Sequence, residues 1–246
     1  MIVLQGLFVT ATGTDAGKTL VTGLLAAAWR KRGIRTGVFK PLASGALRNE
    51  EGKLLSGDAS FLMQAAGIDE KDRAMVNPIC LEPALTPAVA ARLSGVTVNM
   101  KEIIINIQNA AAAYDLILVE GAGGLIAPLW ENYCAVDLLR ELHLPAVLVG
   151  GSGRGSINEV VLSAYYCQQE KIPLKSVILN HWPEQPGYLE QENYAYMKKF
   201  TGLSIDGRVH TLKKAEAETS DYRVLAGIAE KYIDIDKCIA YAKGEL

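Results

Sequence analysis

The segment from Ala11 to Thr19 contains the residues with the clearest capacity for chemistry. It reads Ala-Thr-Gly-Thr-Asp-Ala-Gly-Lys-Thr and lies between an apolar run and a helical pattern. Backbone N–H groups at the start of a helix attract anions, Gly17 allows close approach of the backbone, and Lys18 can reach the outer phosphates of a nucleotide. A Thr directly after that Lys can bind Mg²⁺ through its hydroxyl. The segment therefore predicts a phosphate-binding loop formed by Thr14, Asp15, Ala16, Gly17, Lys18 and Thr19.

One position departs from the usual Walker pattern, because Thr12 stands where a Gly is expected five residues before Gly17. The alternative is an ordinary strand-to-helix turn with a solvated Lys18. Loops of the ParA and MinD class carry an additional Lys near their start, where this chain has Ala, Thr and Gly. This difference argues against a switch that partitions on membranes or DNA.

Two further charged residues stand at the ends of apolar runs. Lys40 ends the run 36–40 and is followed by Ser44, and Glu120 ends the run 116–120 before a Gly-rich turn. Ligands collect at the carboxyl ends of parallel strands, so we expect these side chains near the loop. A second Lys would stabilise charge during phosphoryl transfer, and Glu120 takes the place of a Walker-B-like Mg²⁺ ligand. Alternatively, Lys40 and Glu120 only mark the ends of strands.

Asp58 and the Gly-rich segment 150–158 each have two interpretations. Asp58 is a residue type that caps helix N-termini, and it is also a candidate metal ligand. The segment 150–158 follows an apolar run and opens a helical pattern. One interpretation is that its backbone amides bind a carboxylate or phosphate at the start of the helix, and the other is that it only connects two elements. A dinucleotide fingerprint is not met, because Ser156 stands where a further Gly is required.

The three histidines and the charged run near residue 215 predict no chemistry. His143, His181 and His210 have no metal-ligand spacing and no nucleophile motif beside them, so we interpret them as structural. The run Lys213–Glu218 predicts a solvated face.

These candidate residues need a framework that brings strand ends together. Short apolar runs alternate with helical patterns, which indicates βαβ units around a parallel sheet buried on both faces. Helices are predicted over Lys18–Arg32, ended by Gly33, and over Ile157–Cys167. The stretch Ser44–Ala113 shows no clear strand and predicts a helical insertion. The six predicted strands are Leu7–Thr12, Thr36–Lys40, Leu116–Glu120, Ala146–Gly150, Ser176–Asn180 and Leu203–Val209.

Composition narrows the class of protein. The chain has 246 residues, of which 50% are hydrophobic, so it can bury a large core. Its 25 Lys and Arg are balanced by 27 Asp and Glu, so it lacks a uniform positive field that would bind nucleic acid or an anionic membrane. The N-terminus lacks a signal-peptide pattern and no apolar run reaches membrane-spanning length, so we expect a soluble cytoplasmic protein. No linker or repeat divides the chain. We predict a single α/β domain over 1–246, a P-loop NTPase-like parallel sheet flanked by helices.

The four cysteines are widely spaced and form no Cys-x-x-Cys pair. This pattern indicates neither a zinc site nor a disulfide framework. We therefore expect reduced and mostly buried thiols at Cys80, Cys134, Cys167 and Cys238.

Taken in order, the motifs resemble those of the dethiobiotin synthetase family. The resemblance runs from about Phe8 to Val209, and several short motifs in a fixed order are more specific than one phosphate loop. Its marks are Phe8-Val9-Thr10 leading to Gly17-Lys18-Thr19, Lys40-Pro41-Leu42-Ala43-Ser44-Gly45, Val76-Asn77-Pro78, Glu82-Pro83, Val119-Glu120-Gly121-Ala122-Gly123-Gly124, Gly155-Ser156-Ile157-Asn158 and Leu179-Asn180.

The resemblance implies a homodimer that uses ATP, Mg²⁺ and CO₂ or bicarbonate to close a cyclic urea on 7,8-diaminopelargonic acid. In that family a carbamate of the diamine attacks the γ-phosphate, and the second amine then closes the ring with loss of phosphate. An alternative from another class is a nucleotide-dependent switch or partner-binding ATPase without a small-molecule product. The base preference of the nucleotide stays open, because the Ile-Pro expected after Gly207 is replaced by Val209-His210.

The resemblance also implies a role for each matching position. Lys18 and Lys40 would be catalytic, and Thr19, Asp58 and Glu120 would hold Mg²⁺. Asn180 and Gly207 would join the phosphate loop in binding the nucleotide. The residues that would bind the diamine, in part from the neighbouring subunit, are Thr14, Asp15, Lys40, Ser44, Gly121, Gly123, Gly155, Ser156, Ile157, Asn158 and Tyr196.

Overall fold

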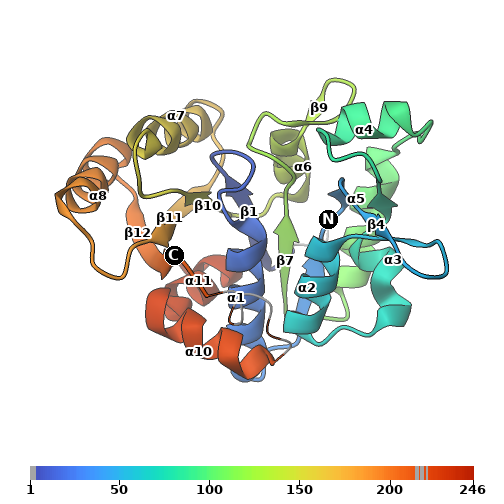
Figure 1. Cartoon of the computed structure of the whole chain (residues 1–246), viewed down its shortest axis with the longest axis horizontal. Coiled ribbons are helices and arrows are strands. Elements are labelled where there is room, and N and C mark those ends of the chain that lie inside the picture. The colour runs from blue at the N-terminus through green and yellow to red at the C-terminus, as the bar shows by residue number, and fades with distance from the viewer. Residues whose placement is uncertain (1–3, 214–215, 217–218, 220) are drawn as a thin grey trace.

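A six-stranded parallel sheet forms the centre of the protein (Figure 1). The computed structural model describes residues 4–213, 216, 219 and 221–246. The strand order is β12-β11-β10-β1-β7-β2. All six predicted strands are confirmed to within two residues, and they span β1 Gly6–Ala11, β2 Thr36–Phe39, β7 Leu116–Glu120, β10 Ala146–Gly150, β11 Leu174–Trp182 and β12 Ser204–His210.

The central strands are apolar along their whole length because both faces of the sheet are covered. In β1 every residue is buried, with Phe8 packed on one side of the sheet and Leu7 and Val9 on the other. At Gly6 a Cβ would lie 2.1 Å from the carbonyl oxygen of Ile117, so only Gly fits beside β7 there. The tight pairing of β1 with its neighbours fixes where the phosphate loop begins.

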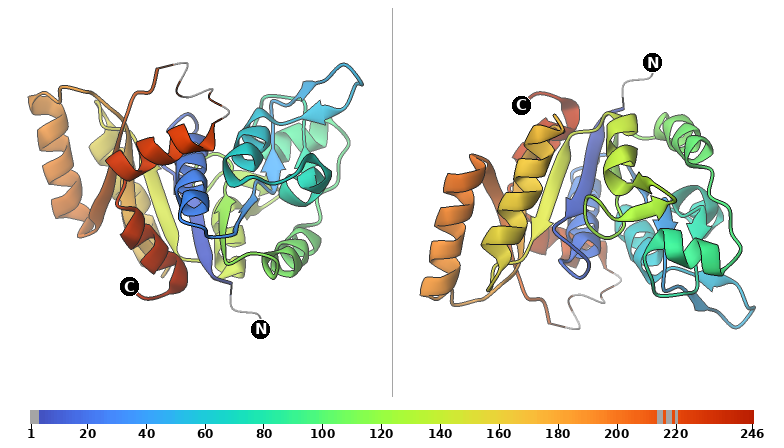
Figure 2. Two further views of the ribbon diagram at one scale, coloured as in Figure 1. Left: turned by 90° about the horizontal axis from the view of Figure 1, so that it is seen from below. Right: turned by 90° about the horizontal axis from the view of Figure 1, so that it is seen from above.

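Helices cover both faces of the sheet (Figure 2). One layer packs around the fully buried Trp29, and the other packs around Phe8 and Phe39. The helix predicted over Lys18–Arg32 is confirmed as α1, with Gly33 at positive φ directly after its cap residue. The first layer contains α1 Lys18–Lys31, α2 Gly57–Ala66, α10 Tyr222–Tyr232 and α11 Ile235–Lys243; the second contains α5 Met100–Ala111, α6 Ala135–Leu142, α7 Ser156–Gln169 and α8 Tyr188–Thr201.

The insertion between β2 and β7 is largely helical, as predicted, but it also contains strands that the sequence analysis did not find. Besides α2 and α5 it holds η1 Glu70–Asp72, α3 Arg73–Val76 and α4 Pro87–Leu93. The missed strands have two residues each, which is too short for a period-2 pattern to show. These strands are β3 Leu42–Ala43, which pairs with β6 Ile79–Cys80, and β4 Leu47–Arg48, which pairs with β5 Leu54–Leu55; a similar pair, β8 Pro128–Trp130 and β9 Tyr133–Cys134, follows β7.

Three further expectations have mixed outcomes. All four cysteines are free thiols, but only Cys167 and Cys238 are buried, while Cys80 and Cys134 are partly exposed. Most of the run Lys213–Glu218 lies outside the described residues. Within the described residues, no helix is both long and apolar enough to cross a membrane, and the cytoplasmic location stays a prediction.

A buried carboxylate ties the C-terminal helix α11 to β12. Asp206 has a 2% exposed side chain and accepts hydrogen bonds from Lys237 Nζ at 2.9 Å, from Tyr241 Oη at 2.8 Å and from Ser204 Oγ at 2.8 Å. Burial alone would raise the pKa of the Asp206 carboxyl, but these donors outweigh it and hold the pKa below its usual value.

Asp206→Asn is expected to lower the free energy of unfolding by about 1–2 kcal/mol at pH 7, because it weakens the hydrogen bonds of a buried carboxylate, while the Lys237 side chain left behind is 45% exposed. Since the folded-state pKa is depressed, the stabilisation is present above the unfolded value of about 3.9 and is lost as pH falls through the folded value. Urea denaturation from pH 7 to pH 3 checks this, and the gap between wild type and variant should shrink below about pH 4. Asp236→Asn, an 85% exposed partner of Arg32, is the control and should cost little.

Candidate active site

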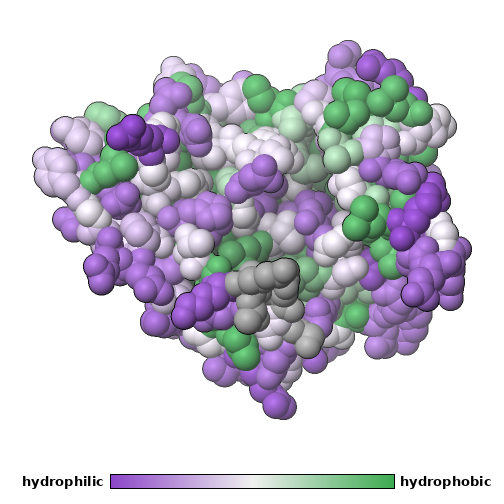
Figure 3. Space-filling view, in the orientation of Figure 1, coloured by the Kyte–Doolittle hydropathy of each residue, from purple (hydrophilic) through white to green (hydrophobic). Residues whose placement is uncertain are grey.

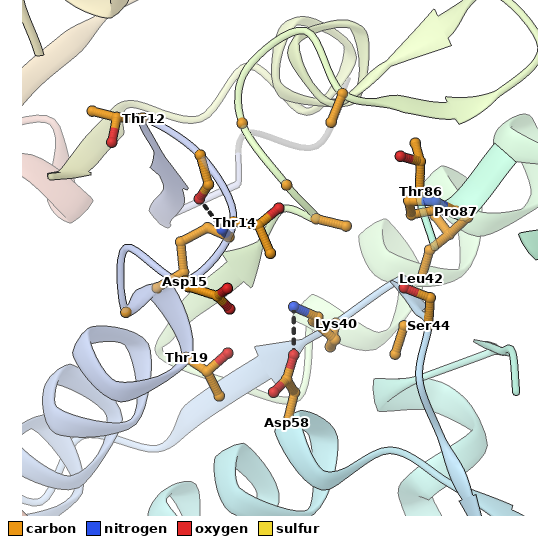
Figure 4. Close-up of a pocket in the computed structure, with 18 of the residues that line it drawn as sticks. Thr12, Thr14, Asp15, Thr19, Lys40, Leu42, Ser44, Asp58, Thr86 and Pro87 are labelled. Atoms are coloured by element: carbon orange, nitrogen blue, oxygen red, sulfur yellow. Dashed lines mark hydrogen bonds and ion pairs between the residues drawn. The ribbon is translucent and has the colours of Figure 1, made fainter. Parts of the chain in front are cut away.

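A cavity of about 890 Å³ opens at the carboxyl ends of β1, β2, β7 and β11 (Figure 4). It brings together residues from the phosphate loop, the insertion and the turn after β7, which are far apart in sequence. The predicted residues that line it are Thr14, Asp15, Gly17, Lys18, Thr19, Lys40, Ser44, Asp58, Gly123 and Asn180.

Asn180, near the end of β11, contacts the phosphate loop. Asn180 Nδ2 donates to the carbonyl of Ala16 at 3.1 Å, and a Cβ on Gly17 would lie 1.9 Å from that same nitrogen. Gly17 also has φ 92°, a conformation that favours glycine. Among the described residues, the backbone N–H groups of 13–19 have no backbone acceptor, so they are available to an anion at the start of α1.

The Lys18 side chain folds over this loop. Its Nζ donates to the carbonyl of Gly13 at 3.1 Å, and only 7% of the residue is exposed. Burial and the nearby Lys40 lower the pKa of Lys18. The geometry thus places an ammonium group against the loop, as the sequence analysis predicts.

Lys40 lies between two carboxylates, those of Glu120 and Asp58, and its contact with Asp58 is drawn in Figure 4. Its Nζ is 2.5 Å from Glu120 Oε1 and 3.0 Å from Asp58 Oδ2. Burial alone would lower the pKa of Lys40, but the carboxylates of Glu120 and Asp58 outweigh it and raise the pKa. Thr19 Oγ1 also donates to Glu120 Oε1 at 2.8 Å, which joins this cluster to the first turn of α1.

The donor set at this point suits Mg²⁺. Glu120 is 1% exposed, and its Oε2 is buried without a hydrogen-bond partner in the described structure. An unpartnered buried carboxylate oxygen beside a Thr hydroxyl and a second carboxylate is the oxygen-rich environment that Mg²⁺ prefers. The described residues hold no group of three or more His, Cys, Asp or Glu side chains suited to a metal, so phosphate oxygens and water would complete the shell.

Asp58 is not a helix cap. Ser56 caps α2 by accepting from the backbone N–H of Ala59, and Asp58 lies in the first turn with its carboxylate turned to Lys40. The capping interpretation is therefore wrong. Gly121 also contacts the cluster, since its carbonyl accepts from Lys40 Nζ at 3.4 Å.

The Gly-rich segment before α7 does not line the cavity. The Ser156 hydroxyl donates to the carbonyl of Gly153, and Asn193 Nδ2 donates to the same carbonyl at 2.8 Å, so these contacts hold the loop together. Glu159, in the first turn of α7, accepts from Thr12 Oγ1 at 3.4 Å. Three predicted residues, Ala16, Glu120 and Gly121, are not part of the cavity lining but contact residues that are. The other predicted residues outside the lining are Gly155, Ser156, Ile157, Asn158, Tyr196 and Gly207, and their roles stay predictions.

Gly207 is built into the sheet. It pairs with Ile178 across β11 and β12 and bridges to Ile233. A Cβ there would lie 3.0 Å from the Ile178 side chain, so packing alone explains the small residue.

His181 is a cavity residue that the sequence analysis missed. The pairing of β11 with β12 shifts between Leu179 and Trp182, and His181 takes φ 55°, so its exposed ring faces the cavity beside Asn180. Its Nε2 is 3.4 Å from the carbonyl of Asp15. The interpretation of His181 as structural did not anticipate this position, for which its place directly after Asn180 at a strand end was the available signal, and a functional role of His181 stays a prediction.

Exposed apolar side chains stand at the mouth of the cavity. Leu85 and Ile126 line it and are 46% and 65% exposed. Figure 3 shows hydrophobic residues gathered over the region of α4, which begins just after Leu85. The cavity therefore has a charged inner end and an apolar rim.

Solved structures share this fold. A ParA family ATPase from Chlorobium tepidum superposes with a TM-score of 0.58 at 17% identity, covering 97% of this chain and 98% of that one. A chain of the MinC:MinD cell division protein complex from Aquifex aeolicus superposes with a TM-score of 0.58 at 13% identity, covering 92% of this chain and 94% of that one. These similarities show the P-loop NTPase-like α/β fold that the sequence predicts, and they show nothing more about function.

Sequence comparison identifies the family. A family profile described as "AAA domain" matches residues 5–219. The protein named ATP-dependent dethiobiotin synthetase BioD from Bacillus thuringiensis (strain Al Hakam) is 32% identical over 242 residues, which cover 98% of this chain and 96% of that protein. The protein of the same name from Clostridium novyi (strain NT) is 30% identical over 239 residues, covering 96% and 98%. With this similarity over nearly its whole length, the chain belongs to the dethiobiotin synthetase family, a family of ligase-type enzymes.

Proposed function

We propose that the protein carboxylates 7,8-diaminopelargonic acid with CO₂ and closes its ureido ring, converting ATP to ADP and phosphate and forming dethiobiotin. The observation that carries this proposal is the meeting of Lys18, Lys40 and the unpaired loop amides at one cavity, beside Glu120 and Asp58. The names of the relatives support ATP as the co-substrate.

The inner end of the cavity is suited to a triphosphate. The loop amides and Lys18 would bind its oxygens, and Asn180 would accept from the base; the buried Oδ1 of Asn180, which has no partner among the described residues, supports this role. Thr19, Asp58 and Glu120 would hold Mg²⁺. When bound, Mg²⁺ would neutralise charge on the phosphate oxygens.

The chain's own residues position the reaction. A carbamate oxygen attacks the γ-phosphorus as the bond to ADP breaks, and Lys18 and Lys40 stabilise the charge that spreads over the phosphoryl oxygens. The second amine then attacks the carbamoyl carbon and phosphate leaves with the carboxyl oxygen it received. Asp15 and Ser44 line the cavity where the amines would lie. No cysteine or histidine nucleophile is required, because catalysis here is mainly positioning and charge stabilisation.

The outer end of the cavity is suited to the rest of the diamine. Leu85 and Ile126 offer apolar surface to its alkyl chain. We place its carboxylate at Gly155–Asn158 and Tyr196 of a second copy in a homodimer. The position of these residues outside the lining of their own cavity supports that arrangement.

The test is phosphate release from ATP with and without 7,8-diaminopelargonate and bicarbonate, followed by mass spectrometry of the product. We expect release to require the diamine and the product to carry one additional carbonyl. A rate indifferent to the diamine would favour the alternative, a nucleotide-dependent switch.

His181→Asn is expected to weaken ATP binding about fivefold, since one polar contact to the phosphate loop contributes about 1 kcal/mol. Asn tolerates positive φ, so the backbone is kept. His143→Asn is the matched control, because His143 has φ 54° but ends α6 and does not line the cavity. Titration calorimetry with a nonhydrolysable ATP analogue measures both, and equal affinities for the two variants would contradict a role for His181.

A further inference from the structure

The two carboxylates best placed for a metal ion already hold a cation that belongs to the chain. Lys40 Nζ contacts Glu120 Oε1 at 2.5 Å, Asp58 Oδ2 at 3.0 Å and the Gly121 carbonyl at 3.4 Å. Lys40 is 4% exposed, so water screens these contacts little. The ammonium group thus stands among the oxygen atoms that Mg²⁺ would use.

We propose that Lys40 acts as a resident cation that keeps free divalent metal out of this site until a nucleotide arrives. The metal then enters together with the phosphates, and Lys40 Nζ moves from the carboxylates to the phosphoryl oxygens. This inference rests on the proposed function, and it adds a binding order: nucleotide and metal bind together, and metal alone binds weakly.

The charge balance of the cluster supports this order. Lys18 and Lys40 carry two positive charges, and Glu120, Asp58 and the nearby Asp15 carry three negative charges, so the two lysines offset all but one of the negative charges. A divalent ion approaching without phosphates therefore meets little net attraction, and the Lys40 ammonium between Glu120 and Asp58 repels it. The phosphates add several negative charges at once, and both the metal and Lys40 then find oxygen ligands.

One observation distinguishes Lys40 from Lys18, and a second shows how the metal could replace the Lys40 ammonium at Glu120. Lys18 donates to the loop carbonyl of Gly13 and to neither carboxylate in the described contacts. Glu120 Oε2 has no hydrogen-bond partner there, so it is available as a ligand when the metal arrives.

The test is the affinity of the nucleotide-free protein for Mn²⁺, measured from the electron paramagnetic resonance signal of unbound Mn²⁺. Wild type should bind Mn²⁺ weakly. Lys40→Met and Lys40→Gln should each bind it about tenfold more tightly or better, because both carboxylates lose their cation. Lys40→Arg, which keeps the charge, should stay weak.

Two controls assign any gain to this site and guard against misfolding. Adding Glu120→Gln to Lys40→Gln should remove the gain. The melting temperature of Lys40→Gln should rise when Mn²⁺ is added, and that of wild type should stay unchanged. The melting temperature without Mn²⁺ also shows whether the variant is destabilised.

The inference is overturned if nucleotide-free wild type binds Mn²⁺ as tightly as the neutral variants, or if Lys40→Arg gains as much as Lys40→Met. These measurements need neither ATP nor the diamine. Failure of the proposed reaction and failure of this inference are therefore distinguishable.

Discussion

Lys18→Ala is expected to lower kcat about 10³-fold, because it removes a preorganised positive charge from the phosphate loop. The ammonium lies over the loop, 3.1 Å from the Gly13 carbonyl, where the outer phosphates would bind. Single-turnover phosphate release at saturating ATP and diamine separates this loss in the chemical step from weaker binding. A rate within tenfold of wild type would contradict the assignment of Lys18 as catalytic.

The fold should survive this substitution. Burial and Lys40 lower the pKa of Lys18, which means that the folded protein disfavours its charge, so a neutral side chain relieves a cost. Melting temperature should therefore be close to that of wild type. Lys31→Ala is the matched control, because Lys31 lies in the last turn of the same helix and is exposed; it should change neither rate nor stability.

The sheet could be predicted from sequence because its strands are long, apolar and buried on both faces. Leu116–Glu120 and Ala146–Gly150 were predicted with the bounds that the structure shows. The short strand Leu42–Ala43 could not be found this way, since its pairing with Ile79–Cys80 depends on contacts between distant parts of the insertion. Two residues carry too little pattern to specify a strand.

The site could be predicted in outline and not in its contacts. Lys18, Lys40 and Glu120 stand at strand ends, and parallel topology alone brings such ends to one edge. The pairing of Lys40 with Asp58 depends on how α2 docks, which no local pattern encodes. The place of His181 after Asn180 at the end of a predicted strand marks it as a candidate. The register shift in β11 that accompanies its positive φ leaves no signal in composition or periodicity, so the direction of its ring could not be predicted.

Glu120→Gln is expected to raise the Mg²⁺ concentration needed for half-maximal activity about 100-fold. Gln keeps the size of the side chain but removes the charge of a buried candidate ligand. Loss of a group that only orients a metal ligand already lowers metal affinity or activity about 10- to 100-fold, so loss of the ligand charge itself should reach the upper end of that range. Mg²⁺ titrations of phosphate release at fixed ATP measure the change, and excess Mg²⁺ should restore part of kcat.

Graded variants test whether this effect comes from the metal. Asp58→Asn should give a smaller shift in the Mg²⁺ requirement, because the Asp58 side chain is 47% exposed whereas that of Glu120 is fully buried. Glu102→Gln, on the exposed side of α5, should give none. The Lys40 ammonium and the Thr19 hydroxyl both donate to Glu120 Oε1. A loss of kcat in Glu120→Gln that no Mg²⁺ concentration relieves would therefore assign Glu120 to orienting those two donors. Coincident Mg²⁺ titrations of Glu120→Gln and wild type would exclude Glu120 as a metal ligand.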